Sequence, residues 1–79
     1  MEKNEIEISV LAVLKTVLSV DLTSESKREE VAEWDSLKHI DVIFSLEDEF
    51  NIRFDEDILI DIVGVTSLVE IINSILNNR

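Results

Sequence analysis

The chain contains two stretches in which apolar residues recur at helical spacing with little ambiguity. In the first stretch, one helix face carries Ile6, Val10, Val13, Leu14, Val17 and Leu18. Near the end of the chain, one face carries Leu68, Val69, Ile71, Ile72, Ile75 and Leu76. These patterns predict amphipathic helices from about Asn4 to Ser19 and over the last part of the chain. Thr66 or Ser67 is suited to cap the later helix, with Glu70 completing a capping box after Ser67.

The region between these stretches predicts a long connection and two further helices. Residues 20–34 are polar and lack a sustained period, which favours a connection along the length of a bundle with a short helical turn around Lys27–Val31. A helix follows from Ser36 to about Asn51, with Asp35 or Ser36 as its cap. The acidic run at 55–57 predicts a short helix to about Ile62, and Gly64, the only glycine, is a stop signal after it. The expected fold is therefore an all-α four-helix bundle, with three longer helices and one short one, in a single domain over residues 1–79.

Composition narrows the possible functions. The chain has 79 residues, of which 46% are hydrophobic, and no cysteine, so one packed core must form without disulfides. Eighteen acidic residues against seven basic ones give a net charge of −11, which disfavours nucleic acid and favours partners with basic patches. No leader-like start and no apolar run near the roughly 20 residues of a membrane span are present, so we expect a cytoplasmic protein without membrane insertion.

The helix from Ser36 has two apolar faces. Val42, Ile43, Leu46 and Phe50 cluster on one face with His39 at the edge, and we expect this face in the core. The opposite face bears Leu37, Ile40 and Phe44 among acidic residues, namely Asp41, Glu47 and Asp48. An exposed apolar stripe with an acidic rim suits transient docking of proteins, although the connection or a second subunit could instead cover it.

Ser36 lies at the start of this helix, where free amides and the helix dipole favour a negatively charged group such as a phosphodiester. Position alone favours a plain helix cap, because capping serines are far commoner than modified ones. A nucleophile–base pair with His39 is disfavoured, because His39 is expected on the core side and no glycine-rich elbow surrounds the serine. Asp55, Glu56 and Asp57 lack the pattern of a calcium loop. We therefore expect neither an enzyme nor a metal site.

Taken together, these features resemble the acyl carrier protein family and its relatives, the peptidyl and aminoacyl carrier domains. The resemblance covers essentially the whole chain. Its most specific part is Asp35-Ser36-Leu37 followed by Asp41, and then the run Leu46–Phe50, with Ile62 and Thr66 at the expected later places.

The resemblance implies that Ser36 receives 4'-phosphopantetheine from coenzyme A through a separate, magnesium-dependent transferase. The arm would then carry an acyl group as a thioester between enzymes. Asp35 would help the transferase engage the serine, and the shared docking surface would comprise Leu37, Ile40, Asp41, Phe44, Glu47 and Asp48. The family also folds cargo between helices, and the candidate lining residues, each equally well explained as plain core, are Val42, Leu46, Phe50, Phe54, Leu59, Ile62 and Leu68.

Several residues depart from the commonest pattern of fatty acid synthesis. Trp34 precedes the motif, Lys38 stands where an acid is usual, and Arg53 interrupts the acidic strip. These departures favour a dedicated lipid, polyketide or cell-surface pathway, so we expect a stand-alone carrier served by an acyl-loading ligase and by acyl-transferring or condensing enzymes. A monomer best fits the exposed docking stripe. Two alternatives stay open, namely an aminoacyl or peptidyl carrier and a non-carrier acidic helical interaction module.

Overall fold

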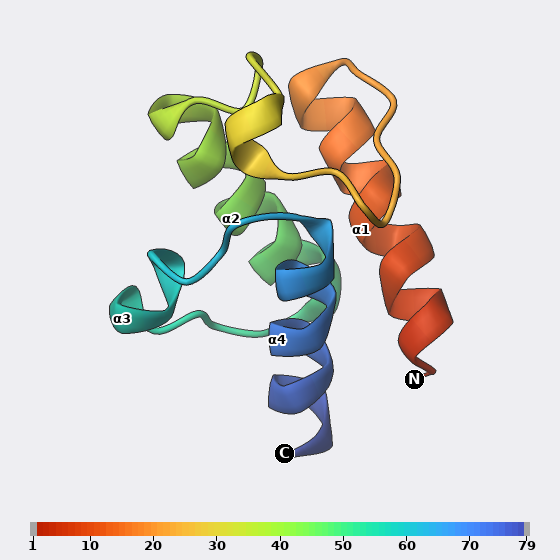
Figure 1. Cartoon of the computed structure of the whole chain (residues 1–79). Coiled ribbons are helices and arrows are strands. Elements are labelled where there is room, and N and C mark those ends of the chain that lie inside the picture. The colour runs from red at the N-terminus through yellow and green to blue at the C-terminus, as the bar shows by residue number, and fades with distance from the viewer. Residues whose placement is uncertain (1, 79) are drawn as a thin grey trace.

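The computed structural model describes residues 2–78 as a small helical bundle (Figure 1). Its elements are α1 (Lys3–Leu18), a 3-10 turn η1 (Arg28–Glu30), α2 (Ser36–Phe50), α3 (Glu56–Leu59) and α4 (Val65–Asn77). Helix α1 packs against both α2 and α4, whereas α3 is a single turn at the side of the bundle. The described residues contain four α-helices and no strand, which confirms the predicted all-α class.

The predicted apolar faces form one core. Residues that are less than a tenth exposed come from each long helix: Ile6, Val10, Leu14 and Leu18 from α1; Val42, Ile43, Leu46 and Phe50 from α2; Val65, Leu68, Val69 and Ile72 from α4. Each fully buried aliphatic side chain contributes about 1.5–3 kcal/mol through removal of apolar surface from water. The three- and four-residue spacing therefore accounts directly for the packing of the three long helices.

The ends of α1 and α2 follow from local chemistry. Helix α1 ends at Ser19 and α2 at Asn51, both in the left-handed conformation, and the N–H of each bonds back to a carbonyl of the last turn. At the start of α2, Asp35 Oδ1 accepts a hydrogen bond from the Lys38 amide at 2.9 Å. Of the two caps that the sequence offered, Asp35 is the one used.

Helix α3 is shorter than predicted, because it ends at Leu59 and not near Ile62. The chain turns after Leu59 through bonds from the amides of Asp61 and Ile62 to carbonyls three residues earlier. This turn carries Ile62 into the core at 2% exposure and leaves Ile60 on the surface. The last turn of the expected helix is therefore absent, because the chain bends there and buries Ile62 in the core.

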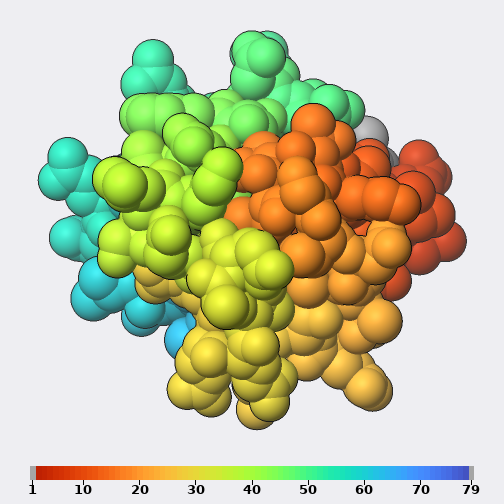
Figure 2. Space-filling view, turned by 90° about the horizontal axis from the view of Figure 1, so that it is seen from above, coloured from red at the N-terminus to blue at the C-terminus, as the bar shows by residue number. Residues whose placement is uncertain are grey.

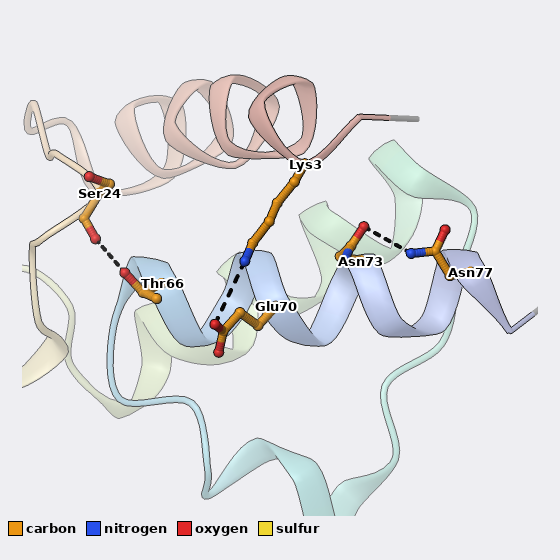
Figure 3. A network of polar contacts seen from close by, with 6 residues as sticks. All are labelled: Lys3, Ser24, Thr66, Glu70, Asn73 and Asn77. Atoms are coloured by element: carbon orange, nitrogen blue, oxygen red, sulfur yellow. Dashed lines mark hydrogen bonds and ion pairs between the residues drawn. The ribbon is translucent and has the colours of Figure 1, made fainter.

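The predicted cap of α4 is also wrong. The helix begins at Val65 with Gly64 as its N-cap and no capping side chain. Thr66 Oγ1 instead donates to the Ser24 carbonyl at 2.8 Å, and Glu70 forms an exposed ion pair with Lys3 rather than a capping box (Figure 3). Thr66 and Glu70 thus contact segments that are distant in the sequence and do not cap the helix.

The connection between α1 and α2 is fixed to the start of α4 by its backbone. The amide of Arg28 donates to the Val63 carbonyl at 2.8 Å, and the amide of Val65 donates to the Ser26 carbonyl at 3.1 Å. Lys27 and Gly64 face each other in an isolated antiparallel bridge. Gly64 is required here by close approach, because a Cβ at this position would lie 2.7 Å from the Ser26 carbonyl oxygen. Its extended backbone makes no demand for glycine.

We expect Gly64→Ala to lower the free energy of unfolding by about 1–3 kcal/mol, because the new methyl group must displace backbone atoms. The matched control is Ser67→Ala, which removes a hydroxyl that makes no hydrogen bond within the described residues. The free energy of unfolding of Ser67→Ala should lie within about 0.5 kcal/mol of the wild-type value, whereas loss of a side chain that caps a helix costs about 1 kcal/mol. Urea denaturation followed by circular dichroism measures both, and equal stability of the two variants would contradict the close-approach argument.

Candidate functional site

Ser36 is the first residue of α2, and its side chain is exposed. Within the described residues its hydroxyl makes no hydrogen bond, since Asp35 performs the capping. The start of α2, yellow-green in Figure 2, lies at the surface of the face seen there. Ser36 therefore presents an accessible hydroxyl at a helix N-terminus, where amides and the helix dipole favour an attached anion.

The second apolar stripe of α2 is exposed, as predicted. Leu37, Ile40 and Phe44 are 79%, 50% and 64% exposed, respectively. Asp41 and Asp48 are exposed on the same helix. No segment of the described chain covers these side chains, so the stripe and its acids form a continuation of the surface around Ser36.

Glu47 differs from the other two acids of this face. It is half-buried, and its Oε2 accepts a hydrogen bond from the Phe54 amide at 2.8 Å. One carboxylate oxygen thus fixes the connection between α2 and α3. Sequence reasoning assigned Glu47 to docking only and missed this structural role, because the bond depends on the path of the chain after α2.

His39 is buried on the core side, in agreement with the prediction, and is 7% exposed. Its Nδ1 accepts a hydrogen bond from Trp34 Nε1 at 3.0 Å, which implies the tautomer protonated at Nε2. No hydrogen bond joins His39 to Ser36 among the described residues, and Nε2 is buried without a hydrogen-bond partner there. The structure therefore brings His39 together with Trp34, a residue that the sequence analysis named only for its place before the Asp35-Ser36-Leu37 motif.

The environment of His39 favours its neutral form. Burial lowers the pKa of the ring below 6.5, the positive charge of Arg28 lowers it further, and the Leu59 carbonyl acts weakly in the opposite direction. Protonation would also replace the acceptor at Nδ1 by a donor and remove the bond from Trp34. The Trp34–His39 pair thus depends on an uncharged imidazole.

The candidate cargo-lining residues lie in or against the hydrophobic core. Val42, Leu46, Ile62 and Leu68 are almost completely buried, Phe50 and Phe54 are at most 9% exposed, and Leu59 is half-buried. Of these seven, Ile62 alone lines a surface cleft with a volume of about 560 Å³. Their burial is what packing of the bundle requires, with or without a cargo.

Residues 2–78 contain neither a cluster of metal-ligating side chains nor a helix suited to span a membrane. No group of three or more His, Asp or Glu side chains is arranged there to hold a metal ion, and Asp55, Glu56 and Asp57 lie at the start of α3. None of the helices in this range combines the length and apolarity needed to cross a membrane.

Comparison with known proteins adds no family assignment. No protein-family model matches the chain, and a search of curated proteins found no match.

We expect the contribution of His39 to stability to be lost as the pH falls. Because the folded-state pKa lies below the unfolded value of 6.5, the unfolded chain binds the proton first on acidification. The free energy of unfolding should therefore decrease, from near pH 6.5 downward, relative to His39→Asn, whose amide oxygen can accept the Trp34 bond without titrating. Denaturation of both proteins between about pH 8 and pH 5 measures this difference, and parallel pH profiles would contradict it. All other titratable groups are the same in the two proteins, so their effects on the free energy of unfolding cancel in the comparison.

Proposed function

We propose that the chain is a carrier protein that holds an acyl intermediate as a thioester on a 4'-phosphopantetheine arm attached to Ser36. It would present this intermediate to enzymes of a dedicated lipid, polyketide or related biosynthetic pathway. The observation that carries the proposal is the free, exposed Ser36 hydroxyl at the start of α2, next to a capping Asp35 and an exposed apolar stripe. A serine needed only for capping would direct its hydroxyl to a backbone amide, and here that bond belongs to Asp35.

The surroundings of Ser36 fit a phosphodiester. The helix N-terminus supplies backbone amides and a positive dipole end, and the exposed position leaves space for a transferase. In the modification, the Ser36 hydroxyl would lose its proton to a base, and its Oγ would bond to the phosphorus of the pantetheine phosphate as the pyrophosphate bond of coenzyme A breaks and adenosine 3',5'-bisphosphate leaves. The transferase would supply the magnesium ion and the base, so Ser36 acts as a substrate. When bound, the arm supplies a terminal thiol for thioester formation.

The exposed stripe supplies a docking surface next to the attachment site. Leu37, Ile40 and Phe44 form an apolar centre, and Asp41 and Asp48 supply negative charge beside it. Such a surface matches enzymes with an apolar depression and a basic rim, and electrostatic attraction accelerates their encounter with it. Loading ligases and condensing enzymes would share this surface in turn, which requires transient binding, and an exposed stripe best fits a monomer.

Two related functions use the same surfaces. An aminoacyl or peptidyl carrier would be modified at the same serine and would differ in the ligase that loads it. A non-carrier interaction module would use the exposed stripe of α2 alone and leave Ser36 unmodified. Modification of Ser36 separates the carrier functions from the module, and the identity of the loaded group separates the two carriers.

The first test is incubation with coenzyme A, magnesium and a broad-specificity phosphopantetheinyl transferase, followed by intact mass and peptide mapping. We expect one phosphopantetheine on Ser36. Ser36→Ala should abolish loading and cost at most about 1 kcal/mol of stability, because Asp35 retains the cap. Ser45→Ala, at a half-buried serine in the same helix, serves as a control that should load normally. A folded wild-type protein that gains no mass with several transferases would overturn the carrier proposal.

The second test concerns docking. Asp41→Lys and Asp48→Lys should slow loading by the transferase, most strongly at low salt, since exposed charges act on encounter rates and are screened by ions. Asp61→Lys, an equal charge change at an exposed residue outside α2, is the control. Reversal of Glu47 is a less clean test because it also removes the bond to the Phe54 amide. Equal rates for all variants at low salt would remove this face of α2 from the docking surface.

A further inference from the structure

A cleft of about 560 Å³ lies between the η1 region and the segment that joins α3 to α4. This volume falls within the range of about 300–1,000 Å³ typical of small-molecule sites. The residues that line it are Lys27, Arg28, Glu29, Val31, Trp34, Ile60, Ile62 and Val63. All but Ile62 lie outside the candidate cargo pocket that the sequence suggested, so this is a different location.

The walls of the cleft are held in place by the fold. The backbone bond from Arg28 to Val63 ties its two sides together at 2.8 Å. Trp34 and Ile62 are each 2% exposed, and the indole of Trp34 is fixed by its bond to His39. The cleft is therefore preformed, which lowers the entropic cost of binding a ligand.

One side of the cleft is apolar and unusually exposed. Ile60 is 83% exposed and Val63 is 59% exposed, although both are large aliphatic residues in a chain with only a small core. The turn after α3 directs the side chains of Ile60 and Val63 outward and buries that of Ile62, which lies between them in the sequence. These side chains offer a surface for a hydrocarbon segment.

The other side carries Lys27 and Arg28, two basic residues beside the acidic Glu29. Lys3 and Lys15 form ion pairs with acidic residues, whereas Lys27 and Arg28 form none within the described residues. This is notable in a chain with eighteen acidic and seven basic residues. Glu29 is the one acid that lines the cleft. Arg28 is half-buried, and a guanidinium without an ion-pair partner is suited to bind a carboxylate through two parallel hydrogen bonds.

The cleft also lies close to Ser36 along the chain. Trp34 lines it, and Trp34 precedes Ser36 by two residues, a separation that spans at most about 7 Å of extended backbone. A group tethered to Ser36 would therefore experience the cleft at high effective concentration.

We propose that this cleft binds an acyl cargo that ends in a carboxylate, with the hydrocarbon segment against Ile60 and Val63 and the carboxylate on Arg28, assisted by Lys27. This inference rests on the proposed function, because the cargo is tethered through Ser36. It assigns the protein to acyl groups with a second acidic end rather than to simple fatty acyl chains.

The test compares two cargoes of equal length. Ser36 is loaded from glutaryl-coenzyme A or pentanoyl-coenzyme A by the transferase, and intact mass establishes loading before any further measurement. Two signals then report on the cleft: the indole N–H of Trp34, the only tryptophan, in ¹⁵N spectra, and contacts between cargo protons and the methyl groups of Ile60 and Val63. We expect the glutaryl form to shift the indole signal and to show these contacts. The pentanoyl form should resemble the unloaded arm.

Variants assign the carboxylate partner. Arg28→Gln should weaken occupancy of the cleft by the glutaryl group about tenfold, as expected for loss of a charge-assisted hydrogen bond. Arg28→Lys should restore part of it. Arg53→Gln removes another cation that forms no ion pair within the described residues and does not line the cleft, so it should leave occupancy unchanged.

The possible results are distinguishable. Failure to load would overturn the proposed function itself. Successful loading without any change at Trp34, Ile60 or Val63 would overturn the cleft assignment and leave the carrier function intact. Equal changes with the pentanoyl group, or with the unloaded arm through its own phosphate, would overturn the assignment to carboxylate-ended cargo.

Discussion

The structure depends most on the backbone contact between the long connection and the start of α4. Two amide–carbonyl bonds join residues 26–28 to residues 63–65, and they form only because Gly64 has no Cβ to meet the Ser26 carbonyl. Ordering a connection of this length costs much conformational entropy, and it has few apolar anchors to offset that cost. The two backbone bonds add to the offset. Fixing it at this point sets the path of the chain toward Trp34 and the first turn of α2.

From that point the arrangement around Ser36 follows in steps. Trp34 enters the core and bonds to His39 one turn into α2, so the start of the helix is held from both sides of Asp35. Asp35 then caps the helix, and Ser36 is left with a free hydroxyl on the surface. The inner face of α2 packs in the core and stabilises the fold. The outer face can therefore expose Leu37, Ile40 and Phe44 while the protein stays folded. Stability and the proposed function are thus assigned to opposite sides of one helix.

Charge is distributed unevenly over the molecule. The exposed ion pairs of Lys3 and Lys15 have side chains more than half exposed and contribute little to stability. The acids on the outer face of α2 give that surface a negative rim, whereas Lys27 and Arg28 give the neighbouring cleft two basic side chains. In the proposed carrier, the first surface would recognise enzymes and the second would recognise the cargo. Both flank the segment from Trp34 to Leu37, where the arm would be attached.

The sequence by itself determined the long helices, the helical turn at residues 28–30, a cap of α2 at Asp35 or Ser36 and the two faces of α2, because each arises from spacing or chemistry within a few residues. It placed the candidate serine at the helix start for the same reason. It did not determine the early end of α3, the contact of Thr66 with Ser24 42 residues away, the role of Gly64, the bond between Trp34 and His39, or the cleft beside them. These features depend on which distant segments meet. Tertiary packing decided them, because a buried side chain or a close backbone contact outweighs the smaller local preferences of caps and short helices.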